Sequence, residues 1–204
     1  DHELGRFLSQ RFGLALALYG DGRSDLVEAY LIPPATQKTH RSAPGALVGL
    51  TIGRHWWQYK VPPLLTIAYA LIVQYRLPPA QSFGALAALL ISVVFLAMQA
   101  HAINDAFDIE YDQRSGKPNA MAMLSPRWRA LLYLLLGVAG LSPWLGIRLG
   151  AWPLVLLTLI VALPLIYAAP PMRLKERGVW GLVADAAYAH AIPSLFVIAL
   201  FSQL

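Results

Sequence analysis

The sequence predicts an all-α, polytopic transmembrane bundle with a short, soluble α/β-like segment at its amino-terminal end. Hydrophobic residues make up 57% of the 204 residues, and the mean hydropathy is +0.53. These values are typical of a chain that is largely embedded in lipid. Residues 82–103 carry no formal charge, and a helix of that length can cross a hydrocarbon core of about 30 Å.

The first 53 residues have a different composition from the rest, with mixed charge, several Gly and Pro, and only short apolar runs. We expect a water-soluble domain, residues 1–53, whose last part is a linker. Residues 14–19 predict a buried strand, residues 20–25 a turn with the sequence GDGRSD, and residues 26–30 a helix. This order resembles the last acidic motif of haloacid-dehalogenase-like phosphatases, which implies that Asp21 and Asp25 help to hold Mg²⁺. A Gly/Asp turn without chemistry explains the same residues, and the family's Asp-x-Asp motif is absent.

Apolar segments fill most of the second domain, residues 54–204. Trp56, Trp57 and Tyr59 open the first of them and suit a belt at the level of the lipid headgroups. Prolines inside these segments are tolerated where neighbouring helices satisfy the freed backbone groups. We expect five spans, over residues 55–75, 82–103, 130–147, 149–169 and 178 to 204.

Two features of the composition limit the possible functions. The chain has no cysteine, which excludes disulfides, a thiolate nucleophile and thiolate metal sites, so oxygen or histidine must hold any metal. Basic residues outnumber acidic ones by 16 to 11, but they lie in the loops of a membrane protein. We therefore expect lipid around the chain and no nucleic-acid partner.

The basic loops also predict an orientation. The amino-terminal segment through Lys60 carries seven Lys and Arg, the loop after the second span four, and the loop after the fourth span three. The opposite side carries only Arg76 and Arg148. The positive-inside rule places the amino terminus and both long loops in the cytoplasm, and we expect an integral protein of a bacterial inner membrane.

The most concentrated polar stretch is residues 104–112, NDAFDIEYD, at the end of the second span. If the helix continues through it, Asp105, Asp108 and Asp112 fall at i, i+3 and i+7 and share one face. Clustered carboxylates suit Mg²⁺, which takes its other ligands from water and phosphate. A solvated acidic helix end is the alternative.

Three basic patches share the predicted cytoplasmic side with these carboxylates. Carboxylates holding Mg²⁺ and ringed by Arg and Lys form a site for a diphosphate. A diphosphate attached to a lipid tail explains why such a site is surrounded by apolar helices. The patches comprise Arg54 and Lys60, Arg114 and Lys117, and Arg173, Lys175 and Arg177 within residues 167–177.

These motifs resemble the UbiA superfamily of intramembrane prenyltransferases. NDAFDIEYD matches the signature NDxxDxxxD, YAAPPMRLKERG at residues 167–178 looks like the family's second basic segment, and Arg54, Trp57 and Lys60 resemble a pattern at the start of its first span. The resemblance covers residues 54–204. It implies a bundle of nine helices with a second Asp-rich motif, so we expect this chain to be a fragment that is inactive alone.

The resemblance also implies a mechanism. Asn104, Asp105, Asp108 and Asp112 hold Mg²⁺ on an isoprenyl diphosphate, and the basic residues neutralise the diphosphate as it leaves. A small lipophilic acceptor, such as an aromatic ring, then attacks the allylic carbocation. Tyr167 could face this cation or donate a hydrogen bond to a phosphate oxygen, and an anchor at the membrane interface is the alternative. The implied catalytic residues are Asp108, Asp112, Lys175 and Tyr167, and the implied diphosphate-binding residues are Arg114, Lys117, Arg173 and Lys175.

Three further ionisable residues lie within the apolar segments. Asp185 and His190 are costly inside a span, so they are candidates for lining the acceptor cavity, although they could equally satisfy polar atoms of neighbouring helices. His101 precedes the acidic motif by less than one turn. It is either a partner of the site or a packed helix residue.

Two other functions remain open. Phosphoribosyl transfer to a polyprenyl phosphate is the first, because the Arg-Trp-Lys start resembles superfamily members with that activity. The second is a cation-handling membrane protein, in which Asp105, Asp108, Asp112, Asp185 and His190 line an ion path. That function predicts carboxylates near the middle of the membrane.

Overall fold

The computed structural model describes residues 15–19, 28–32, 56–117 and 119–204. The chain divides into two compact units, residues 1–42 and 43–204. The domain boundary expected near residue 53 lies outside the described residues, as do Asp21, Asp25 and Arg54.

The first unit contains an antiparallel pair of strands, β1 (Ala15–Tyr19) and β2 (Glu28–Ile32). Ala15 pairs with Ile32 and Tyr19 with Glu28, which gives a continuous register of five residue pairs. The strand predicted over residues 14–19 is therefore confirmed for residues 15–19, while residue 14 and the predicted burial of the strand lie outside what the structure describes. The predicted helix over residues 26–30 is wrong from Glu28 onward, because β1 provides these residues with backbone partners in a sheet. The α/β character expected of this segment is not confirmed.

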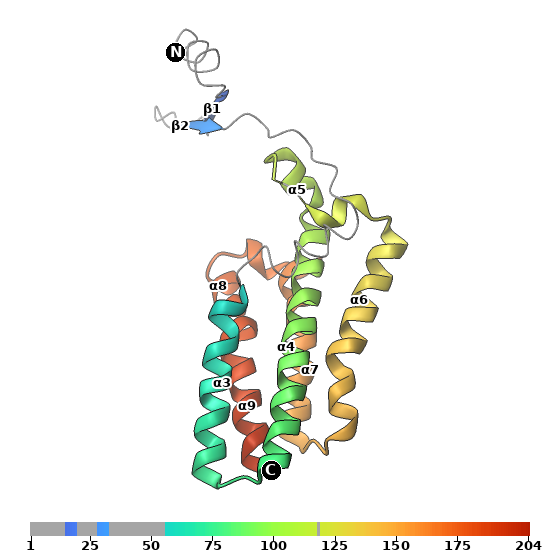
Figure 1. Cartoon of the computed structure of the whole chain (residues 1–204). Helices are drawn as coiled ribbons and strands as arrows, with labels where there is room; N and C mark the ends of the chain where they lie inside the picture. Colours follow the sequence, from blue (N-terminus) through green and yellow to red (C-terminus); the bar gives the residue numbers. More distant parts are fainter. Residues whose placement is uncertain (1–14, 20–27, 33–55, 118) are drawn as a thin grey trace. The chain divides into compact units, whose positions relative to one another are not determined.

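In the described part of the second unit, all elements of secondary structure are helices. Its α-helices are α3 (Trp56–Tyr75), α4 (Pro79–Phe107), α5 (Ile109–Arg114), α6 (Pro126–Leu141), α7 (Ala151–Ala168), α8 (Val179–Ala186) and α9 (Ile192–Gln203). Short 3-10 turns follow α5, α6 and α7, namely η2 (Ala120–Met123), η3 (Ser142–Gly146) and η4 (Leu174–Glu176), and a π-helical turn, η5 (Ala187–Ala191), joins α8 to α9. Figure 1 shows α3, α4, α6, α7 and α9 running roughly parallel, with α5 and α8 at one end.

Four helical stretches of the described residues are long and apolar enough to cross a membrane: Pro79–Phe107, Pro126–Gly146, Ala151–Ala168 and Val179–Gln203. They correspond to the second to fifth predicted spans and are consistent with an integral membrane protein. The first predicted span forms α3 but is not among the four, because Gln58, Lys60 and two prolines make its first turns polar. The nine spans implied by the family resemblance are not confirmed.

Helix α4 is the central element of the bundle, since it contacts α3, α6 and α7. Its small residues Ala85 and Ala88 are buried in a core that also contains Phe196, Leu200 and Phe201 of α9. On the α6 side, a Cβ at Gly140 would lie 2.7 Å from Cδ2 of Leu96. Small residues of this kind allow helix backbones in membranes to approach closely.

Candidate functional site

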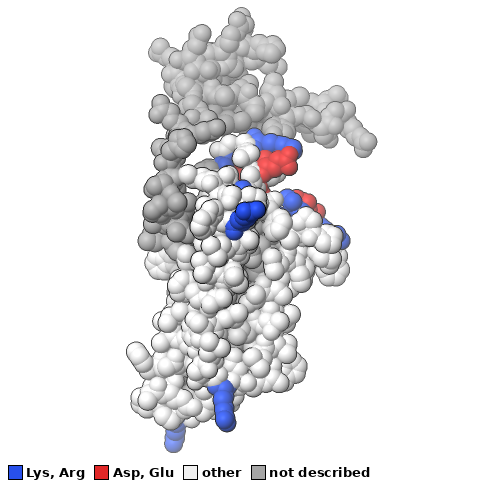
Figure 2. All heavy atoms as spheres, turned by 90° about the vertical axis from the view of Figure 1, so that its right-hand side faces the viewer, with Lys and Arg blue, Asp and Glu red and all other residues white. Residues whose placement is uncertain are grey.

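Charged side chains gather at one end of the helical unit. Figure 2 shows Lys, Arg, Asp and Glu together near that end, above a flank that is almost entirely uncharged. The flank exposes large apolar side chains, among them Leu134 and Val138 of α6 and Trp152 of α7. Such a surface suits lipid, and the charged end suits water or headgroups.

The acidic motif does not form one continuous helix. Helix α4 ends at Phe107, Asp108 has a non-helical backbone (φ −104°, ψ 3°), and α5 begins at Ile109. The backbone N–H of Asp108 still donates to the carbonyl of Asn104 at 3.1 Å, and that of Asp112 to the carbonyl of Asp108 at 2.8 Å. The condition of an unbroken helix through residues 104–112 is therefore not met, because Asp108 ends α4 and stands directly before α5 with a non-helical backbone.

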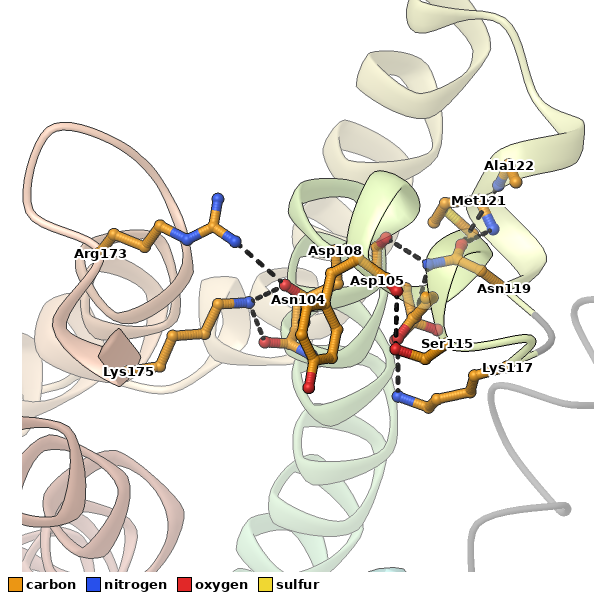
Figure 3. Close-up of polar contacts among 12 residues, drawn as sticks. Asn104, Asp105, Asp108, Ser115, Lys117, Asn119, Met121, Ala122, Arg173 and Lys175 are labelled. Atoms are coloured by element: carbon orange, nitrogen blue, oxygen red, sulfur yellow. Dashed lines mark hydrogen bonds and ion pairs between the residues drawn. The ribbon is translucent and has the colours of Figure 1, made fainter. Parts of the chain in front are cut away.

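Asp108 and Asn104 meet the basic loop that follows α7 (Figure 3). The Lys175 ammonium donates to Oδ1 of Asp108 at 2.5 Å and to Oδ1 of Asn104 at 3.0 Å. An Arg173 guanidinium nitrogen lies 3.5 Å from the same Asp108 oxygen. The side chains of Lys175 and Asp108 are only 12% and 15% exposed, so solvent screens this interaction much less than it would a surface pair.

Asp112 has a different set of partners. Its Oδ1 accepts from the Lys117 ammonium at 3.1 Å and its Oδ2 from the Asn119 amide at 2.8 Å. The Asn119 amide also donates to the backbone carbonyl of Asp105 at 2.6 Å, and its oxygen caps the first turn of η2. Asp112 and Asp105 are each only 1% exposed. Asn119 thus ties the end of α4 to α5 and η2.

The acidic motif therefore has two halves with separate partners. This separation determines which of its side chains could bind the expected Mg²⁺ together. In the described part of the chain, no group of three or more His, Cys, Asp or Glu side chains is placed to hold a metal ion. Two oxygens do converge, because Asn104 and Asp108 both accept from the Lys175 ammonium. A small hard cation with further ligands from phosphate fits these two oxygens. The Asp112 side chain instead meets Lys117 and Asn119.

The loop carrying Lys175 is held in place by close packing. A Cβ at Gly181 would lie 2.8 Å from the Leu174 carbonyl and 3.1 Å from the Lys175 Cα, so only glycine allows α8 to lie this near η4. Arg173 has a left-handed backbone (φ 36°, ψ 56°), which costs on the order of 1 kcal/mol. Its side chain forms an ion pair with Glu176 at 2.6 Å.

Arg114, which was expected to bind the diphosphate, and Arg177 of the third basic patch have other partners. Arg114 pairs with Glu110 one turn earlier at 2.5 Å, and both side chains are more than three quarters exposed. Arg177 donates to the backbone carbonyl of Pro171 at 3.0 Å at an exposed position. Neither makes an ion pair with Asp108 or Asp112 among the described residues.

An apolar cavity begins near this cluster and lies between α3, α4, α7, η5 and α9. Lys60 and Tyr188 line its polar end, where the Lys60 ammonium lies 5.7 Å from the centre of the Tyr188 ring. The Tyr188 ring lies 5.2 Å from that of Tyr167, centre to centre. Tyr167 lies within electrostatic reach of both Asp108 and Asp185, and Asp185 within reach of Lys60. The tyrosine pair thus connects the charged cluster with the cavity.

The structure brings together most, but not all, of the predicted site residues. His190 is exposed and does not line the cavity, and His101 lies one turn before Asp105 on α4. Sequence reasoning missed Asn119 and Tyr188. Asn119 had a detectable signal, because Asn is a preferred residue before a helical turn, whereas nothing local distinguishes Tyr188 from a packed aromatic residue.

The fold and the charged cluster define a helical protein with candidate membrane spans and a polar site at one end of the bundle. A search found no family model, no curated protein and no solved structure that matches this chain.

Proposed function

We propose that the protein is an intramembrane prenyltransferase, which moves an isoprenyl group from its diphosphate to a small lipophilic acceptor. One observation carries the proposal: Asn104, Asp108 and Lys175 form a polar cluster, and the lining of an apolar cavity reaches Ala100, one helical turn before Asn104 on α4. An amphiphile with an anionic head and an apolar tail suits both parts. The sequence resemblance of residues 54–204 to the UbiA superfamily points to the same substrate class.

The diphosphate head would bind at the charged cluster. Lys175 and Arg173 already face an anionic oxygen of Asp108, so both can turn to phosphate oxygens, which the fork of Arg and the point charge of Lys bind well. Asn104 and Asp108 would hold Mg²⁺, with phosphate oxygens as its other ligands. When bound, the ion would supply positive charge to the leaving group. Asp105 and Asp112 would stabilise the conformation of the acidic motif.

The isoprenyl tail would lie in the apolar cavity. Apart from Lys60, Ser92 and Tyr188, the residues that line this cavity are apolar, which suits an isoprenoid chain. Tyr167 and Tyr188 stand where the cavity meets the charged cluster. The allylic carbon would therefore lie beside two aromatic rings, whose faces favour positive charge.

In the transfer itself, the bond between the allylic carbon and the diphosphate oxygen breaks, and its electron pair leaves with the diphosphate. Lys175 and Arg173 stabilise the negative charge that develops there, a contribution made in the transition state. A new bond forms between the allylic carbon and the acceptor, which releases a proton. Asp185, beside Tyr188 and Lys60, is the candidate for positioning the acceptor.

The charge distribution favours a cytoplasmic site. Among the described residues, Arg76 and Arg148 lie at the end opposite the charged cluster, and the positive-inside rule then places the cluster in the cytoplasm. The absence of cysteine allows a clean test. Single cysteines at Ser115 and Ser142 should react with a membrane-impermeant reagent from opposite sides, and reaction from the same side would contradict this orientation.

An activity test uses the intact protein in lipid nanodiscs with Mg²⁺. One arm supplies isoprenyl diphosphates and a phenolic acceptor, and the other supplies phosphoribosyl diphosphate and a polyprenyl phosphate. We expect a prenylated product and released diphosphate in the first arm only, with both lost in the Lys175→Met variant and kept in the exposed Glu110→Gln control. Product in the second arm alone would replace the proposal with phosphoribosyl transfer. Ion flux without donor or product would favour cation handling.

A further inference from the structure

The cavity has a polar end near the charged cluster and a lower end at the buried core of the bundle, where Phe196 belongs to the same core as Leu200 and Phe201. Lys60, Ala100 and Tyr188 line its polar end, and Leu89 and Phe196 line the other. Along α4 the lining residues run from Ala100 to Leu89, a helix length of roughly 16 Å at 1.5 Å per residue. The cavity is therefore elongated along the bundle.

Phe196 at the lower end rests on Trp144. The two rings meet edge to face, with their centres 5.1 Å apart and their planes at 80°, a favourable aromatic geometry. Both side chains are buried, and Trp144 belongs to η3, between α6 and α7. Figure 1 shows the turn joining α6 to α7 at the end of the bundle away from α5.

Hydrogen bonds hold Trp144 in position. Its indole N–H donates to the Ser92 hydroxyl oxygen at 2.7 Å, and the Ser92 hydroxyl in turn donates to the Gly140 carbonyl. Ser92 is buried and lines the cavity. Because these polar groups lie in an apolar core, breaking either bond would leave a buried group unsatisfied. The rings cannot easily move aside for a longer tail.

We propose that Phe196, supported by Trp144 and Ser92, is the residue that sets the longest isoprenyl tail the site accepts. This inference rests on the proposed function and adds a specificity-determining residue to it. A tail that ends above Phe196 lies against the apolar residues that line the cavity. A longer tail must displace the rings or leave part of itself outside, so its transfer is slower.

The test compares geranyl, farnesyl and geranylgeranyl diphosphates as donors for the intact protein, with the acceptor held constant. In the Phe196→Ala variant we expect the ratio of kcat/KM for the longest donor to that for the shortest to rise about 10-fold or more, since apolar pockets discriminate by this amount for small changes in fit. The opposite change, Ala97→Phe, narrows the cavity above the floor and should lower the same ratio.

Phe201→Ala is the matched control. Phe201 lies on the same helix, is 0% exposed and does not line the cavity, so its truncation loses the same ring without opening the floor. We expect lower stability with an unchanged ratio. Ser92→Ala, which frees the Trp144 indole while keeping both rings, should raise the ratio by less than Phe196→Ala does.

The outcomes separate the two proposals. If the wild-type protein transfers the isoprenyl group but Phe196→Ala and Phe201→Ala give equal donor ratios, the role of Phe196 is overturned and the proposed function stands. A tail that leaves the cavity sideways into lipid would produce that result. No transfer with any donor, in a protein that is folded by its thermal transition, overturns both.

Discussion

Asp108 and Asp112 lie one helical turn apart in one acidic motif, yet they are held in different ways. Asp108 is paired with Lys175 and Arg173, which lie more than sixty residues later in the chain. Asp112 is paired with Lys117 and Asn119, five and seven residues away. Asp112 is also the more deeply buried of the two.

This difference suggests separate tasks for the two carboxylates. The partners of Asp108 come from another loop, so they can exchange that carboxylate for an anionic ligand without disturbing α4 or α5. The partners of Asp112 close a local turn, and losing them would unfold the connection to η2. We therefore expect Asp108 to matter most for donor binding and catalysis, and Asp112 to matter most for the shape of the site.

The largest expected effect comes from Asp108→Asn. The change keeps the size and one oxygen but removes the charge, and it should lower prenyl transfer by about 10³-fold because the metal and the basic residues lose their common anchor. Asp112→Asn is the matched change in the other half, with a smaller loss of kcat/KM and a larger loss of thermal stability. Equal losses of activity would mean that both carboxylates contact the donor, as the motif in the sequence predicts.

The two lysines give the next largest contrast. Lys175→Met should reduce kcat/KM by about 10²-fold, because a buried donor to the leaving group is lost. Lys117 is 56% exposed, and Asn119 still binds its buried partner Asp112, so Lys117→Met should change kcat/KM by less than about 3-fold. Competition by inorganic pyrophosphate gives an independent measure of head-group binding. A weaker inhibition in Lys117→Met than in Lys175→Met would reverse the comparison.

The two asparagines separate stability from activity. Asn119→Ala should lower the free energy of unfolding by about 1–3 kcal/mol, because it removes bonds to Asp112 and to the Asp105 carbonyl and a helix cap. Asn104→Ala loses one bond to Lys175 and should cost less than about 1 kcal/mol while reducing Mg²⁺-dependent transfer. Thermal unfolding in detergent and initial rates of transfer measure both. A stable but inactive Asn119→Ala variant would refute a purely structural role.

The smallest effect is expected at Arg114. Its ion pair with Glu110 is exposed, so Arg114→Gln should change stability by less than about 0.5 kcal/mol and leave the rate of transfer nearly unchanged. Rates measured at saturating and at low donor concentration check this. A clear rise in KM for the donor would show that Arg114 turns inward when the diphosphate binds.

Much of the helical unit could be predicted from the sequence, because long apolar runs leave few alternatives to membrane-length helices. The predicted span over residues 82–103 became α4, which extends to Phe107. The boundaries shifted because proline starts helices well: α4 begins at Pro79 and α6 at Pro126. The helix predicted near Glu28 failed, since antiparallel pairing with the preceding strand, β1, outweighs weak local propensity.

The site was less predictable than the helices. The motif at residues 104–112 identified the carboxylates, but helical spacing alone placed Asp108 and Asp112 on one face. The break at Asp108, and the choice of Lys175 or Lys117 as partner, depend on how η4 and η2 pack against the helix ends. Tyr188 reaches Tyr167 through the π-helical turn Ala187–Ala191, and no residue pattern in the sequence encodes that turn.

Helix α4 fixes the distance between the proposed head-group site and the lower end of the cavity, since it carries both Asn104 of that site and Ser92 of the cavity lining. The difference of twelve in residue number fixes a separation of roughly 18 Å along the helix. Inserting or deleting one residue would change this length by only about 1.5 Å but would rotate one end by about 100° relative to the other. Tail length can therefore be retuned by side chains at the floor far more easily than by changing the helix.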